Sequence, residues 1–147
     1  MNASETISYL LGSWRVRRAL VDQRSGETSS FEGVATFSLN PAPTGDAVRF
    51  EEIGEMAVGP YRGEASRRLD YRAKDERTLL VAFCDGRHFI DLDLARGHSS
   101  DVHRCGADRY EITTIARSPE LLEERWRVRG PRKDYVALTT FQRLAEE

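Results

Sequence analysis

Two histidines and a short polar stretch carry most of the chemistry that this sequence offers. The stretch contains His103, Cys105, Asp108 and Tyr110, and His88 and Asp91 precede it. Residues two apart on a strand share a face, so His103 and Cys105 could supply two ligands to a metal ion. No spacing in the sequence brings a third ligand from His88, Asp91 or Asp108 to the same point. We therefore expect no metal centre.

Acid–base chemistry is the enzymatic alternative. Histidine is the side chain that titrates near neutral pH when unperturbed, so His103 and His88 are the candidate general bases. Asp91 or Asp108 could orient the imidazole, which makes Asp108 a further catalytic candidate, and Tyr110 could stabilise negative charge. Such a site would suit an isomerisation, a cyclisation or a lyase reaction. Cys105 lacks a recognisable nucleophile context, and the scattered glycines form no phosphate-binding loop.

The elements that must position these residues are almost all strands. An apolar spacing at Ile7, Leu10 and Leu11 predicts one helix over 4–11, with Ser4 as its N-cap and Gly12 as its end. From Trp14 onward the apolar period is two. We expect ten strands, at 14–22, 31–39, 47–53, 62–72, 78–84, 89–94, 99–104, 109–116, 123–129 and 134–144. Turn residues separate them, for example over 41–46, at Asp85-Gly86 and at Arg96-Gly97-His98.

Length and composition indicate one globular domain spanning 1–147. The chain has 147 residues, 22 basic and 24 acidic side chains, a net charge of −2 and 39% hydrophobic residues. This balance does not favour a nucleic-acid partner. No window holds the roughly 18–20 apolar residues of a membrane span, and no signal peptide is visible. We therefore expect a cytoplasmic protein, with no membrane association, whose Cys84 and Cys105 are free thiols.

Gly12, Trp14 and Arg143 distinguish a barrel from a sandwich. Gly12-Ser13-Trp14 lies between the helix and the first strand, and Arg143 lies near the end of the last strand. This arrangement resembles the lipocalin and calycin pattern, in which an arginine packs across the tryptophan that plugs the closed end. The resemblance implies an all-β fold, a closed antiparallel up-and-down barrel of eight to ten strands, over 14–144. The short N-terminal helix, within 1–12, would close one end.

Three longer runs of residues point to one family within this wider group. They are Asp85 to Phe89, His103 to Tyr110, and Trp126 to Tyr135, the last reading Trp-Arg-Val-Arg-Gly-Pro-Arg-Lys-Asp-Tyr. Together they resemble a bacterial and fungal family of lipocalin-like domains of unknown function. Because that family is uncharacterised, the resemblance implies a calycin-type barrel and no particular chemistry.

The barrel interior is where we expect a small-molecule ligand. If Trp14 points inward, so does Arg18, and a buried arginine requires either a carboxylate or an anionic ligand. The expected ligand-binding residues are Arg18, Arg67, Tyr71, His103, Cys105, Tyr110 and Trp126. They would suit a planar or amphipathic molecule bearing a carboxylate. This hypothesis predicts a cavity of about 300 Å³ or more and at least one unpaired cation.

Several alternatives remain open at this stage. If Trp126 points inward, Arg125, Arg127 and Arg129 face outward and, with Arg132 and Lys133, form a cationic stripe that could bind a protein partner. The opposite orientation would turn these arginines into the pocket. No cofactor is predicted, although a haem or another tetrapyrrole held by one axial histidine is a third hypothesis. We expect a monomer or a homodimer.

Overall fold

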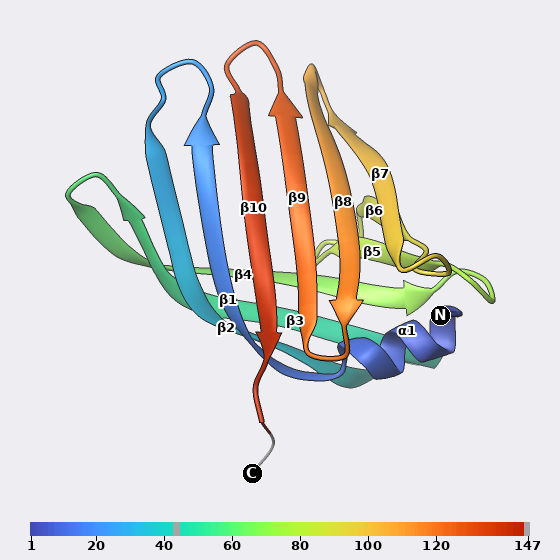
Figure 1. The fold of residues 1–147 in the computed structure, drawn as a ribbon. Helices are drawn as coiled ribbons and strands as arrows, with labels where there is room; N and C mark the ends of the chain where they lie inside the picture. Colours follow the sequence, from blue (N-terminus) through green and yellow to red (C-terminus); the bar gives the residue numbers. More distant parts are fainter. Residues whose placement is uncertain (43–44, 146–147) are drawn as a thin grey trace.

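The computed structural model shows one strongly curled antiparallel sheet with a single helix at one end (Figure 1). It describes residues 1–42 and 45–145. The helix is α1 (Ala3–Leu10). The ten strands are β1 (Gly12–Asp22), β2 (Thr28–Ala42), β3 (Gly45–Val58), β4 (Tyr61–Ala73), β5 (Leu79–Phe83), β6 (His88–Leu92), β7 (His98–Cys105), β8 (Asp108–Ser118), β9 (Leu121–Arg129) and β10 (Asp134–Arg143).

The strands form a nearly closed up-and-down barrel. Their order is β6-β5-β4-β3-β2-β1-β10-β9-β8-β7, and every neighbouring pair is antiparallel. No backbone ladder joins β6 to β7 within residues 1–42 and 45–145. Side chains bridge this seam instead. The Asp101 carboxylate accepts a hydrogen bond from Asp91 N at 2.7 Å, and Ser99 Oγ accepts one from Asp93 N at 3.0 Å.

The expected fold class is confirmed, whereas several boundaries differ from the sequence prediction. The helix starts one residue earlier, because Asn2 rather than Ser4 is the N-cap and forms a capping box with Glu5. His98 begins β7 instead of lying in a turn. Strands β2 and β3 extend well beyond the predicted 31–39 and 47–53. The turn predicted at 41–46 falls partly on 43–44, which lie outside the described residues.

Trp14 and Arg143 lie together at the end of the barrel where α1 packs. The Trp14 indole is fully buried and donates a hydrogen bond to Leu10 O at 2.9 Å. The Arg143 guanidinium lies 4.1 Å from the indole ring centroid. It also donates to the backbone carbonyls of Leu11, at 3.0 Å, and of Tyr9. One side chain thus stacks on the core tryptophan and ties the last strand to the helix.

The period-two alternation determines which side chains line the interior. In β1 the inward residues Trp14 and Val16 are fully buried, whereas Arg15 and Arg17 are exposed. In β9 Val128 is buried and pairs with Tyr135 of β10, while Arg129 is exposed. No helix among the described residues is long and apolar enough to cross a bilayer.

Candidate functional site at the end opposite the helix

A buried carboxylate joins two arginines inside the barrel. Glu52 of β3 is 3% exposed. Arg18 of β1 donates to both of its oxygens, from Nη2 at 2.7 Å and from Nη1 at 3.2 Å. Arg67 of β4 donates from Nε to Glu52 Oε2 at 2.9 Å. Glu52 and Arg67 share the inward face because they pair across the β3–β4 ladder, and Arg18 shares it because it alternates with the buried Trp14 and Val16 of β1.

The network continues into strands β9 and β10. Arg18 Nε donates to Thr139 Oγ1 at 2.8 Å, and Arg67 Nη2 lies 3.6 Å from Glu124 Oε1. The same Glu124 oxygen accepts a hydrogen bond from Trp126 Nε1 at 2.6 Å. Two cations and two carboxylates therefore meet inside the barrel. Besides Glu52 of β3, the polar contacts come from β1, β4, β9 and β10.

Charge pairing decides the ionisation of this network. Burial by itself would raise the pKa of Glu52, but Arg67 and the hydrogen bonds from Arg18 outweigh it and hold this pKa below its ordinary value. Burial would lower the pKa of Arg67, but Glu124 and Glu52 raise it overall. Burial, helped by Glu124, raises the pKa of Tyr71, so its phenol stays protonated. Glu52 and Arg67 are thus both charged at neutral pH.

A cleft of about 180 Å³ opens beside Arg18, Glu52 and Arg67. Its walls include Leu20, Phe31, Met56 and Ala65. A guanidinium has five N–H donors, and Glu52 and Thr139 account for three of those of Arg18. Arg18 lines the cleft, whose walls combine these apolar side chains with Ser29, Ser30 and Ser66. An occupant that accepts hydrogen bonds would satisfy further donors of Arg18.

Two expectations about the interior are wrong. Arg18 is not an unpaired cation, because Glu52 neutralises it. The cleft is also smaller than the expected 300 Å³, and a second interior space, among Phe50, Phe141 and their neighbours, measures only about 20 Å³. The physical reason is the size of the inward side chains: aromatic rings and Leu69 fill the middle of the barrel.

An aromatic cluster lies next to Arg67. The ring of His103 in β7 lies 5.2 Å from Phe89 and 5.9 Å from Tyr110, and Trp126 lies 5.6 Å from Phe89 and 6.0 Å from Tyr110. Arg67 stacks 5.6 Å from the Trp126 ring centroid. The structure thus brings His103, Tyr110, Trp126 and Arg67 together. Tyr71 packs deeper, 5.6 Å from Phe37.

Lys133 lies at the edge of this aromatic cluster and contacts Tyr110. Its ammonium donates to Tyr110 Oη at 2.7 Å and lies 3.2 Å from Asp108 Oδ2. These two contacts raise the pKa of Lys133, the hydrogen bond to Tyr110 contributing most. Asp108 therefore pairs with Lys133, and among the described residues Asp108 accepts no hydrogen bond from His103.

His88 and the two cysteines make none of the ring contacts of this cluster, although Cys105 pairs with Asp108 in the β7–β8 ladder. His88 is on the outer face of β6, where its Nε2 lies 2.9 Å from Asp91 Oδ1. Asp91 also accepts from Lys74 Nζ at 2.8 Å, which lowers the pKa of Asp91. The ligand atoms of His88, Asp91 and Asp101 lie within 4.8 Å of one another, but Lys74 already supplies the positive charge there. Cys105, like Cys84, is an exposed free thiol.

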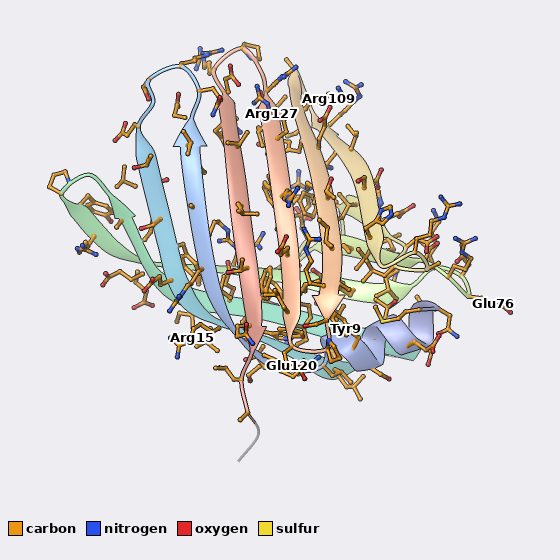
Figure 2. All side chains as sticks on the ribbon, viewed as in Figure 1. Tyr9, Arg15, Glu76, Arg109, Glu120 and Arg127 are labelled. Atoms are coloured by element: carbon orange, nitrogen blue, oxygen red, sulfur yellow. The ribbon has the colours of Figure 1, made fainter. Side chains whose placement is uncertain are left out.

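Arg125 and Arg129 of the expected cationic stripe are exposed on the outside of the barrel, whereas Lys133 turns to Tyr110 and Asp108. Figure 2 labels Arg127 on β9 and Arg109 on the neighbouring β8, near the ends away from α1. Arg127 pairs with Asp134 at 2.7 Å, and Arg125 lies 3.7 Å from Glu123. Acidic neighbours thus neutralise part of the stripe, which reduces its attraction for an acidic partner.

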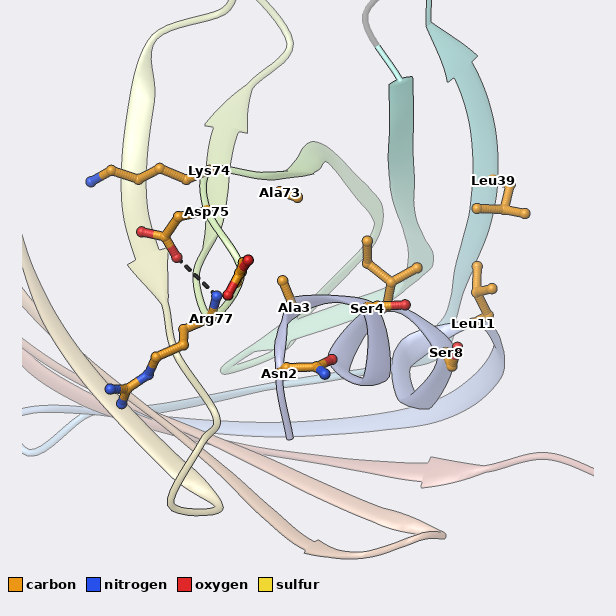
Figure 3. Close-up of a pocket in the computed structure, with 12 residues that line it drawn as sticks. Asn2, Ala3, Ser4, Ser8, Leu11, Leu39, Ala73, Lys74, Asp75 and Arg77 are labelled. Carbon is orange, nitrogen blue, oxygen red and sulfur yellow. Dashed lines mark hydrogen bonds between the residues drawn. The ribbon is translucent and has the colours of Figure 1, made fainter.

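A larger groove, of about 890 Å³, lies outside the barrel between α1 and the β4–β5 turn (Figure 3). Its walls include Ile7, Leu11, Leu39 and Ala73, and Arg77 and its acidic neighbours line the turn. It contains none of the residues expected to bind a ligand.

Sequence reasoning missed Glu52 and Glu124, the two carboxylates of the site. A signal for Glu52 was available, because Val48, Phe50 and Glu52 alternate on one face of β3. A carboxylate in that series implies a buried cationic partner. Glu124 follows Leu122 in the same way in β9.

A family model covers residues 10–143 and describes a family of unknown function, DUF6314. The chain belongs to this family. The match spans the barrel from the end of α1 to Arg143, and therefore includes every strand of the candidate site. No curated protein matches this DUF6314 member significantly in sequence.

Solved structures similar to this DUF6314 domain share its barrel. An S-type phycobiliprotein lyase, CPES, from Guillardia theta superposes with a TM-score of 0.75 at 14% identity, over 100% of this chain and 95% of the lyase. A protein of unknown function from the DUF3598 family, from Nostoc punctiforme, superposes with a TM-score of 0.59 at 16% identity, over 94% of this chain and 49% of that protein. The redesigned barrel mFAP1, bound to DFHBI, superposes with a TM-score of 0.47 at 15% identity, over 93% of this chain and 97% of mFAP1. At 14% and 16% identity, the likeness to the lyase and to the DUF3598 protein shows the barrel fold alone.

Proposed function

We propose that this DUF6314 domain binds a small amphipathic molecule at the end of the barrel opposite α1. The ligand places a hydrogen-bond-accepting group, most simply a carboxylate, against Arg18 and Arg67. Its flat apolar part packs against Trp126 and the neighbouring rings. The observation that carries the proposal is the cleft of about 180 Å³ that combines apolar walls with guanidinium donors.

Arg18 and Arg67 carry more N–H groups than Glu52 and Thr139 accept from, and both side chains line the cleft. Glu52 is already occupied by donors from both arginines, so it cannot accept from all of them. Planar guanidinium groups match the geometry of a carboxylate and bind it with two parallel hydrogen bonds. The cleft lies below the roughly 300 Å³ of typical ligand pockets, so only the polar group and a few further atoms would be enclosed. The rest of the ligand would lie against the rim.

The experiment is a calorimetric titration with 2-naphthoic acid, which joins a carboxylate to a flat apolar body. The wild-type domain is expected to bind it at one saturable site. Arg67→Met should weaken this binding by about tenfold or more, because a charge-assisted contact is lost. The matched control is Arg68→Met, because Arg68 is the next residue of β4 and is exposed on the other face.

Equal affinities for Arg67→Met and Arg68→Met would refute the proposed site. Native mass spectrometry of the freshly purified domain would identify a co-purifying molecule directly. A Soret band after haem addition, lost in His103→Ala, would instead identify a tetrapyrrole held by His103 as the occupant.

A further inference from the structure

Lys133, Tyr110 and Asp108 form a compact polar group at the rim of the aromatic cluster. Asp108 and Tyr110 are two residues apart in β8, and Lys133 reaches them from the β9–β10 turn. Gly130 makes this approach possible. A Cβ at this position would lie 1.9 Å from Asp108 Oδ1, so any side chain there would displace the carboxylate.

The direction of one hydrogen bond determines what Tyr110 can do. An ammonium group has donors and no acceptor, so the phenol oxygen must accept from Lys133. The phenol proton is then left to donate elsewhere. Within residues 1–42 and 45–145, no acceptor for that proton is found. Tyr110 therefore presents an O–H donor whose oxygen is held by a cation.

The charge state of Lys133 excludes a different role. Its contacts with Tyr110 and Asp108 raise the pKa of Lys133, so the side chain stays an ammonium at neutral pH. A charged ammonium cannot attack a carbonyl carbon as a nucleophile. Lys133 can, however, donate its third N–H to an anionic oxygen alongside the phenol of Tyr110.

Trp126 contacts both Tyr110 of this group and Arg67, which lines the cleft of about 180 Å³. The ring of Tyr110 meets the Trp126 indole edge-on, 6.0 Å away with an interplanar angle of 86°. Arg67 lies 5.6 Å from the centroid of the same indole. The Trp126 indole thus contacts the guanidinium of Arg67 and the ring of Tyr110, whose hydroxyl is bonded to Lys133.

We propose that Tyr110, Lys133 and Asp108 form a second polar subsite that binds an anionic oxygen of the ligand. The ligand class is then a flat molecule with an acidic group at each end, one for Arg67 and one for Tyr110 and Lys133. Asp108 acts by positioning the ammonium. This inference rests on the proposed function, because it requires a ligand that lies along Trp126.

The test compares naphthalene-2,6-dicarboxylic acid with 2-naphthoic acid in calorimetric titrations. The wild-type domain should bind the diacid about tenfold more tightly, because the second carboxylate gains charge-assisted hydrogen bonds. Tyr110→Phe, which removes only the hydroxyl, and Lys133→Met should each reduce this preference to less than threefold. Lys74→Met, which changes the other lysine of the chain, is the control and should keep the preference.

The outcomes separate this inference from the proposed function. If the wild type binds both acids equally, or if either Tyr110→Phe or Lys133→Met keeps the preference for the diacid, the second subsite is wrong while the arginine cleft stands. If neither acid binds the wild type, the proposed function fails and the inference fails with it. Thermal melts of all variants verify that each is folded.

Discussion

Replacing Glu52 with glutamine tests how much the buried network of Glu52, Arg18 and Arg67 contributes to the free energy of unfolding. The Glu52 side chain is 2% exposed, and those of Arg18 and Arg67 are 19% and 26% exposed. Removing one partner of a buried ion pair costs about 3–5 kcal/mol. Glutamine retains an acceptor and the arginines reach some water, so we expect about 3 kcal/mol. In a domain of this length that loss lowers the Tm by about 6–12 °C.

The assay is denaturant unfolding followed by tryptophan fluorescence, with Glu55→Gln as the matched control. Glu55 lies in the same strand, and its ion pair with Arg62 is exposed. We therefore expect the control to change the free energy of unfolding by less than about 1 kcal/mol. A second variant replaces Glu52, Glu124 and both arginines by apolar residues of similar size. It should recover most of the lost stability, because it leaves no charge unpaired.

The pH dependence follows from the lowered pKa of Glu52. A carboxylate whose pKa is lower in the folded state stabilises the fold above its unfolded pKa, and this contribution is lost as the pH falls through the folded pKa. The stability difference between wild type and Glu52→Gln should thus be largest at neutral pH and shrink below the ordinary glutamate pKa of 4.5. Glu52→Gln and Glu55→Gln of equal stability at pH 7 would refute the reasoning.

Three further predictions concern other parts of the barrel. Arg143→Lys should lower the free energy of unfolding by about 2 kcal/mol in denaturant melts, because lysine keeps the charge but loses the planar stacking and the forked donors. Asp101→Ala should speed hydrogen exchange of the Asp91 amide by roughly tenfold or more, because the amide loses its acceptor across the β6–β7 seam, and unchanged exchange would contradict the role of that side chain. Gly130→Ala should displace Asp108 and bring the pKa of Lys133, measured by NMR titration, back toward 10.5.

The alternation of residues was enough to predict the strands and which side chains share a face of each strand. Trp14, Val16 and Arg18 were expected on one face of the first strand, and the structure turns that face inward. Trp126 and Val128 likewise share the inward face of β9, whereas Arg125 and Arg129 are exposed. Side chains in a strand alternate with a period of two, so one buried tryptophan determines the orientation of its whole strand.

The composition of the site depended on contacts between strands far apart in the chain. Arg18 and Glu52 are separated by 34 positions, and Lys133 and Tyr110 by 23. Periodicity assigns each of these residues to a face, but the register of the ladders and the curvature of the sheet decide which inward side chains meet. For the same reason the sequence could not show that the expected cavity of about 300 Å³ is mostly filled by Phe50 and Phe141.

The sequence by itself therefore determined an all-β chain of ten strands, a helix at one end and which side chains share a face of each strand. These properties depend on local spacing and side-chain size. Only the tertiary structure decided that Glu52 neutralises Arg18, that Asp108 binds Lys133 rather than His103, and that the cleft is small. These properties depend on the distances between inward side chains of different strands, which are set when the sheet curls and brings β6 beside β7.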